Sequence, residues 1–166
     1  TAQAVAWFQK ERLPAPGAVG MFCAAAMQYL MGDMWYVNTA LLGLDISASS
    51  ADSPRLHYVA AESLDDPLFS PARSPRILER FPPSLLISST RDPSLSDVVY
   101  THSQLVKLGV TAHLHIWEGL GHGFFYLPEL PESREVYDVV VKFFEQYLGS
   151  DKRSHGSNSA VKADKS

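Results

Sequence analysis

Residues 81–123 read FPPSLLISSTRDPSLSDVVYTHSQLVKLGVTAHLHIWEGLGHG, and this stretch decides the class of fold. Its apolar run Leu85–Ser89 predicts a buried strand, and the helix that follows the polar turn ends near Gly109. A second strand is predicted over Ala112–Trp117. A helix between two strands is the usual crossover that joins them in parallel. We therefore expect two neighbouring parallel strands whose carboxyl ends open into loops at one edge of a sheet.

The segments on either side continue this alternation of helices and strands. Thr1–Arg12 predicts an opening helix, and Ala18–Ala26 is an apolar run short enough for a strand buried on both faces. Residues 27–81 lack a clear period and predict irregular helices and long loops. The apolar stripe of the opening helix consists of Ala4, Val5, Trp7 and Phe8, and that of a closing helix of Val136, Val139, Val140, Phe143, Phe144 and Tyr147. The pattern predicts an α/β fold, with the strands of a parallel sheet alternating with helices.

Composition and charge exclude several classes of protein. Of the 166 residues, 46% are hydrophobic, which excludes a chain that is disordered throughout. Residues 150–166 predict a disordered polar tail and leave residues 1–149 as the folded portion. The tail holds 4 of the 14 Lys and Arg and 2 of the 18 Asp and Glu, so the folded portion carries 10 basic against 16 acidic side chains. This acidic balance argues against a nucleic-acid partner, and the longest apolar stretch, Met21–Leu44, contains too many polar residues for a membrane span.

Two loops at the ends of the predicted strands carry candidate catalytic residues. Asp92 follows the first strand, and His122 stands between Gly121 and Gly123 after the second. Open α/β sheets bind their ligands beyond the carboxyl ends of the strands. An acidic residue and the histidine that it orients are two of the three members of a hydrolytic triad. Taken alone, Asp92 also fits the role of a turn former beside Pro93.

Four short motifs resemble segments of one enzyme family, in the same order and spacing. Residues 66–71 (DPLFSP) are similar to its D-P-x-x-S-P segment, and residues 81–87 (FPPSLLI) to its L-P-P strand. Residues 91–97 (RDPSLSD) are similar to its D-P-L-x-D loop, and residues 121–124 (GHGF) to its H-G-F motif. The chain resembles the hormone-sensitive-lipase-like branch of the α/β-hydrolases, which includes many bacterial carboxylesterases, over nearly all of residues 1–148.

This resemblance implies an esterase site. Asp92 would be the triad acid, His122 the general base and Asp97 a supporting carboxylate near the loop. Asp97 also follows Ser94 by three residues, which predicts a capping box at the start of the helix. The implied substrate is a small acyl ester, and a triad of this kind needs no cofactor and no metal.

The resemblance also suggests residues that bind substrate. It places the segment Met27–Val37, which is rich in Met and aromatic residues, beside the active site. Met31 and Trp35 are candidates for the lining of an acyl pocket, although the same residue types also build an ordinary core. Phe124 follows His122 and either contacts the substrate or anchors the loop.

The nucleophile of the family does not occur in the sequence. A serine on a G-x-S-x-G elbow precedes the acid in α/β-hydrolases, and none of the 166 residues forms this motif. Residues 1–6 resemble the helix just after the elbow, so we expect the serine a few residues upstream of Thr1 and the H-G-G oxyanion motif farther upstream. The chain would then be the C-terminal part of an α/β-hydrolase and inactive alone. Among the serines that precede Asp92, Ser47, Ser49 and Ser50 are candidate replacements, but they lack the elbow glycines and are not expected to act as the nucleophile.

Other interpretations stay open beside the esterase. His113 and His115 share one face of the predicted strand and, with His122, could supply three ligands to zinc, although no H-E-x-x-H spacing is present. A non-catalytic binding protein on a hydrolase scaffold also fits a chain that lacks the nucleophile. Cys23, the single cysteine, is interpreted as a small core hydrophobe, because reactive thiols need partly exposed, electropositive surroundings.

Overall fold

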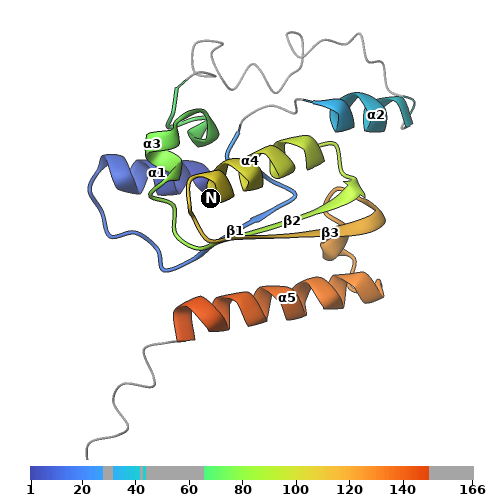
Figure 1. The fold of residues 1–166 in the computed structure, drawn as a ribbon. Helices are drawn as coiled ribbons and strands as arrows, with labels where there is room; N and C mark the ends of the chain where they lie inside the picture. The colour runs from blue at the N-terminus through green and yellow to red at the C-terminus, as the bar shows by residue number, and fades with distance from the viewer. Residues whose placement is uncertain (28–31, 42, 44–65, 150–166) are drawn as a thin grey trace, which may run out of the picture.

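A three-stranded parallel sheet forms the centre of the molecule (Figure 1). The computed structural model describes residues 1–27, 32–41, 43 and 66–149. Its strands are β1 (Val19–Phe22), β2 (Ser84–Arg91) and β3 (Ala112–Gly121), in the order β1-β2-β3. The predicted pairing of the second and third strands in parallel is therefore confirmed.

Helices cover both faces of the sheet, with α1, α3 and α4 on one face and α5 on the other (Figure 1). The helices are α1 (Ala2–Lys10), α2 (Asp33–Leu41), α3 (Pro75–Leu78), α4 (Leu95–Lys107) and α5 (Pro131–Leu148), with 3-10 turns η4 (Pro71–Arg73) and η5 (Phe124–Tyr126). This arrangement confirms the α/β class. Within these ranges no helix has the length and apolar character needed to cross a membrane.

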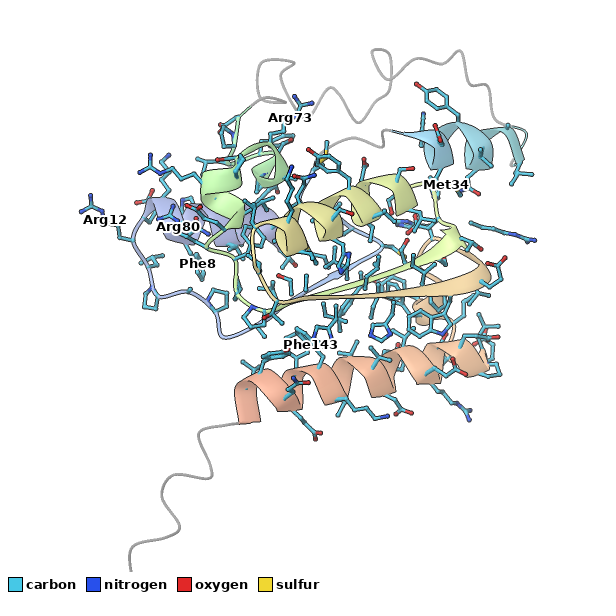
Figure 2. The ribbon with its side chains drawn as sticks, in the orientation of Figure 1. Phe8, Arg12, Met34, Arg73, Arg80 and Phe143 are labelled. Carbon is cyan, nitrogen blue, oxygen red and sulfur yellow. The ribbon has the colours of Figure 1, made fainter. Side chains whose placement is uncertain are left out.

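Strand β2 is the core of the sheet, because it is paired on both sides and buried on both faces. Leu86 packs in a cluster with residues of α1 and α4, whereas Leu85 and Ile87 pack in a cluster with Phe143 of α5. Figure 2 shows the Phe143 side chain on the side of α5 that faces the sheet. Two covered faces explain why this strand is a continuous apolar run rather than an alternating one.

Several elements differ from their predicted form, and β3 continues to Gly121 rather than ending at Trp117. The first strand ends at Phe22 and not at Ala26, because Cys23 has a φ of 48° and so leaves the extended conformation. The buried side of α1 consists of Ala2, Val5 and Ala6, so the predicted stripe was partly wrong. Trp7 is 48% exposed instead. The predicted tail from residue 150 and the three serines between 47 and 50 lie outside the described residues.

The outer edge of β1 predicts how the purified chain behaves. Strand β1 pairs with β2 on one side, and no described strand pairs with its other side. Unpaired strand edges are templates for association, and the exposed Trp7 indole adds apolar surface. We expect light scattering to give a mass above that of an 18.3 kDa monomer, rising with concentration, and we expect hydrophobic dyes to bind.

Substitution Trp7→Glu should reduce dye binding with only a small loss of unfolding free energy, because about half of this indole is exposed and it packs against Phe8 of the same helix. A monodisperse monomer that binds no dye and unfolds cooperatively would contradict this account of the β1 edge.

Candidate active site

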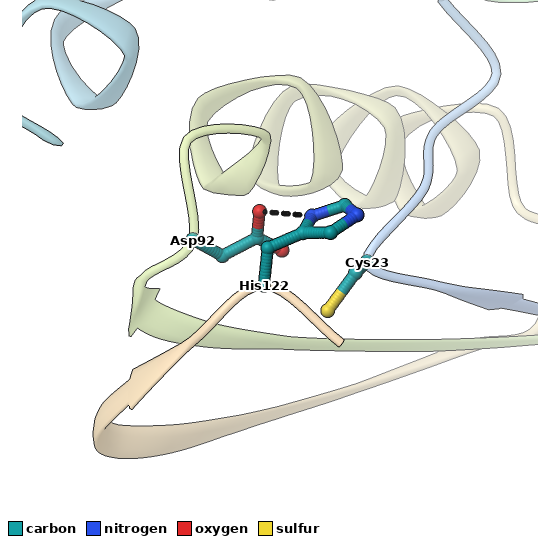
Figure 3. A group of neighbouring side chains, drawn as sticks. All are labelled: Cys23, Asp92 and His122. Atoms are coloured by element: carbon teal, nitrogen blue, oxygen red, sulfur yellow. Dashed lines mark hydrogen bonds and ion pairs between the residues drawn. The ribbon is translucent and has the colours of Figure 1, made fainter. Parts of the chain in front are cut away.

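The ends of β2 and β3 bring an aspartate and a histidine together. The two strands run in parallel, and Arg91 is paired with Gly121, so the residues that follow them emerge at the same edge of the sheet. His122 Nδ1 lies 2.9 Å from Asp92 Oδ1, within hydrogen-bonding distance (Figure 3). The predicted proximity of these two side chains is confirmed. An ionised carboxylate only accepts hydrogen bonds, so Nδ1 carries the proton and Nε2 is left as the basic nitrogen.

Asp92 is buried in a set of hydrogen-bond donors. The Ser88 hydroxyl donates to Oδ2 at 2.8 Å, while the Ser94 backbone N–H at 2.9 Å and hydroxyl at 2.7 Å donate to Oδ1. Burial acts to raise the pKa of Asp92, but the hydrogen bonds from His122 and Ser94 outweigh it and the net pKa is below the ordinary value. The carboxylate therefore stays ionised at neutral pH, as an orienting partner for histidine must.

Ser94 has a different function from the one predicted. It is the N-cap residue of α4 but makes no side-chain capping hydrogen bond, so the predicted capping box is wrong. Its hydroxyl lies 2.7 Å from the Asp92 carboxylate and 3.2 Å from the carbonyl oxygen of Cys23. A buried carboxylate is a stronger acceptor for the hydroxyl than competing groups, because it is charged. Ser94 thus links Asp92 to the end of β1.

His122 is exposed, although the loop that carries it is anchored. Its side chain is 61% exposed, whereas that of Asp92 is 0% exposed. Gly123 follows with a φ of 72°, a conformation that glycine adopts at low cost, and the chain then enters η5. Phe124 and Phe125 of η5 are buried in the cluster that packs against α5. The backbone of the His122 loop is therefore anchored in the core, while the imidazole itself is open to solvent.

Cys23 is a third member of this cluster that the sequence did not assign to it. Its burial was predicted, but its Sγ lies beside the Asp92–His122 pair and accepts a hydrogen bond from Gly123 N–H at 3.3 Å (Figure 3). Burial raises the pKa of the thiol to about 12. The thiol is protonated at neutral pH and so is not a ready nucleophile.

The remaining predicted site residues differ in position. Asp97 is buried in the first turn of α4, and Trp35 is half-buried in α2, which approaches α4 through a hydrogen bond from Met34 N–H to Ser96 Oγ at 3.1 Å. Met31 lies outside the described residues. Phe124 is 3% exposed and packs against Trp117, with ring centroids 5.7 Å apart, which favours anchoring of the loop over substrate contact.

The three-histidine zinc site that the sequence left open as an alternative does not form among the described residues. His113 and His115 are half-buried beneath α5 rather than on a solvated face. His113 Nε2 lies 3.1 Å from the Tyr147 hydroxyl. Burial, with a smaller effect of the neighbouring His113, lowers the pKa of His115. In the described ranges, the ligand atoms that come within 4.8 Å of one another in a group of three belong instead to Cys23, Asp92 and His122.

Comparison with known proteins places the chain in a family. Residues 1–126 match a family described as alpha/beta hydrolase fold. No curated protein matches the chain. A solved structure of an esterase, E25, is 29% identical with a TM-score of 0.75, and the match covers 88% of this chain and 45% of that one.

Two further solved structures share the fold at lower identity. Carboxyl esterase 2 (TmelEST2) from the mycorrhizal fungus Tuber melanosporum is 22% identical, with a TM-score of 0.73 and a match over 89% of this chain and 50% of that one. An esterase from the bacterial hormone-sensitive lipase family is 20% identical, with a TM-score of 0.76 and a match over 89% and 49%. The chain spans about half the length of these structures. As its resemblance to the hormone-sensitive-lipase-like branch predicts, the chain belongs to the alpha/beta hydrolase fold family.

Proposed function

We propose that this chain supplies the acid and the general base of a serine-dependent carboxylic ester hydrolase. Asp92 is the acid, His122 is the base, and the nucleophilic serine lies upstream of residue 1. The observation that carries the proposal is the hydrogen bond between the buried Asp92 carboxylate and Nδ1 of the exposed His122 imidazole. A hydrolytic triad requires an acid that orients the histidine and a basic histidine nitrogen that the nucleophile can reach. The buried carboxylate and the exposed imidazole fit these two requirements.

The chemistry follows from the weakness of a serine hydroxyl as a nucleophile. Nε2 of His122 takes the hydroxyl proton as the serine attacks the ester carbonyl, and returns it to the leaving alcohol. Asp92 keeps the ring in the tautomer with Nδ1 protonated and stabilises the imidazolium that forms, without itself taking the proton. The donors from Ser88 and Ser94 hold the carboxylate in place during this exchange.

Residues 1–166 alone should be inactive on this account. Removing the serine from a triad leaves only about 10³- to 10⁴-fold acceleration over water, which comes from the oxyanion hole and from substrate binding. The oxyanion-hole motif of the family is also expected upstream of the chain, so even this remainder would be missing.

The substrate that we propose is a small acyl ester. E25 and the other two structures are named as esterases, and this supports an ester substrate. E25 is 29% identical to this chain, and the other two are 22% and 20% identical. Met31 and Trp35 remain our candidates for an acyl pocket and Asp97 for a supporting carboxylate. Phe124 is proposed mainly as the anchor of the loop that carries His122, because it is buried.

Hydrolysis of short-chain p-nitrophenyl esters tests the proposal. The complete protein should hydrolyse them, with a rate that falls as acid protonates His122, because only the neutral ring accepts the serine proton. The 166-residue chain should serve as the inactive control. Turnover by this chain at a rate comparable to that of the complete protein would contradict the upstream serine, and an inactive complete protein would favour a non-catalytic binding function.

A further inference from the structure

Three different kinds of metal ligand converge where the strands of the sheet end. Cys23 follows β1, Asp92 follows β2 and His122 follows β3, and one ligand atom of each lies within 4.8 Å of the other two (Figure 3). The set comprises a thiol sulfur, a carboxylate oxygen and an imidazole nitrogen. The proposed mechanism of ester hydrolysis uses the last two groups, while the thiol takes no part in its proton transfers.

The backbone brings this buried thiol to the edge of the core cluster, beside the Asp92–His122 pair. Cys23 adopts a φ of 48° directly after β1, while its N–H still donates to Ile87 O at 2.7 Å. The side chain is thereby turned toward the His122 loop, where Gly123 N–H donates to Sγ at 3.3 Å. A residue that only filled the core would not need this conformation, which is costly for any residue with a Cβ atom.

We propose that Cys23, Asp92 and His122 form a binding site for a thiophilic divalent cation, of which Zn²⁺ is the representative. Zinc takes sulfur, nitrogen and oxygen ligands in a tetrahedron, and three protein ligands leave the fourth position to water. Ligand atoms on one such ion lie roughly 3.3–3.7 Å apart. The three side chains therefore need only a small rearrangement, in which Nδ1 of His122 and Oδ1 of Asp92, now 2.9 Å apart, would separate slightly if both bound the ion. The exposed imidazole of His122 can make most of it and gives the ion a path from solvent.

Binding exchanges one bond for another without any redox step. The S–H bond of Cys23 breaks, a sulfur–zinc bond forms, and the proton passes to solvent. The Ser88 and Ser94 donors that surround Asp92 provide the outer hydrogen bonds that orient a ligating carboxylate. Displacing the proton of a buried thiol opposes binding, so we expect a weaker site than a structural zinc site, one that responds to added metal.

The consequence for activity rests on the proposed function. Zinc on Nδ1 of His122 breaks the hydrogen bond to Asp92, and zinc on Nε2 occupies the lone pair that accepts the serine proton. Either mode removes the general base. The cation is therefore expected to be an inhibitor that competes with catalysis for the same imidazole.

Cobalt spectroscopy on the metal-free chain tests the site without any need for activity. Co²⁺ takes similar ligands, and a thiolate bound to it gives a charge-transfer band in the near ultraviolet. The chain contains one cysteine, so this band reports Cys23 alone. We expect a band that saturates at one Co²⁺ per chain, that Zn²⁺ abolishes and that Cys23→Ser lacks. Substitution His122→Gln should weaken Co²⁺ binding by roughly tenfold or more, whereas the matched control His115→Gln should not.

The same titration on the complete protein removes any dependence on how the isolated chain folds. There the difference between wild-type and Cys23→Ser spectra assigns the band. No difference band, or a band that His122→Gln leaves unchanged, would overturn the metal site.

Ester hydrolysis by the complete protein separates this proposal from the proposed function. Zn²⁺ should inhibit hydrolysis, and Cys23→Ser should raise the inhibitory concentration by roughly tenfold or more, measured against the metal-free rate of each variant. A protein that binds Co²⁺ through Cys23 but hydrolyses no ester would refute the function and keep the site. A protein that hydrolyses esters but shows no difference band would do the reverse.

Discussion

Substitution His122→Ala should lower kcat/KM of the complete protein for a p-nitrophenyl ester by about 10⁴- to 10⁶-fold. In the proposed mechanism the imidazole removes the serine proton in the first step and delivers it to the leaving group, and no other described side chain both contacts Asp92 and is exposed to solvent as a base. The effect should fall on kcat, because proton transfer takes place in the transition state and not in the substrate complex.

His115→Ala is the matched control for this experiment. His115 lies on β3, the strand that His122 follows, beneath α5, and packs against Trp117 with ring centroids 6.1 Å apart. Its loss should change the rate little. A His122→Ala protein that keeps most of its activity would exclude His122 as the base, whereas equal losses in both variants would indicate damage to the fold.

Substitution Asp92→Asn should lower kcat by about 10⁴-fold. The amide nitrogen of asparagine can donate toward Nδ1 and favours the tautomer in which Nε2 carries the proton, so the ring can no longer accept a proton from serine. The ¹⁵N chemical shifts of the His122 ring should report this exchange of tautomers directly. Asp138→Asn, an exposed change on α5, is the matched control and should leave both rate and shifts unaltered.

Asp92→Asn should also change how the stability of the fold depends on pH. The folded-state pKa of Asp92 is lowered, so its ionised form contributes stability that is present above the ordinary aspartate pKa of about 3.9 and is lost as pH falls through the folded value. The unfolding free energy of wild type should therefore fall more steeply below about pH 4 than that of Asp92→Asn. Parallel acid profiles would contradict the lowered pKa.

Much of the fold could be predicted because one strand carries so much of the core. Leu85, Leu86 and Ile87 are fully buried, and an uninterrupted apolar run followed by a turn and a helix is typical of a central strand in a parallel sheet. Once two parallel neighbours were predicted, the meeting of Asp92 and His122 followed from topology, since both residues come just after a strand. Local sequence and global fold agree at this point.

The contributions of Cys23 and Ser94 could not be predicted in the same way. Nothing in the apolar run 18–26 indicates that the strand ends at Phe22, because the positive φ of Cys23 accompanies contacts with Ser94 and Gly123, which are distant in sequence. Ser94 has the spacing of a helix cap, but a buried carboxylate competes for its hydroxyl and binds it. A local sequence pattern identifies the groups that can form hydrogen bonds, but the tertiary fold determines which partners lie close enough to bind them.

The helix faces show a similar limit. The apolar residues of α1 include Trp7, yet the face that packs is the one with smaller residues, Ala2, Val5 and Ala6. His113 and His115 share one face of β3 as expected, but only the position of α5 makes that face half-buried. Periodicity predicts which residues share a face and not what covers it.

Labelling of the complete protein with a fluorophosphonate, followed by peptide mass spectrometry, tests the central claim most directly. The reagent bonds to a serine that a neighbouring base has activated. We predict one adduct, on a serine a few residues upstream of Thr1, formed rapidly in wild type and in His115→Ala and only very slowly in His122→Ala and Asp92→Asn. An adduct within residues 1–166, or labelling that proceeds equally fast without His122, would contradict the assignment of Asp92 and His122 as the acid and base of this triad.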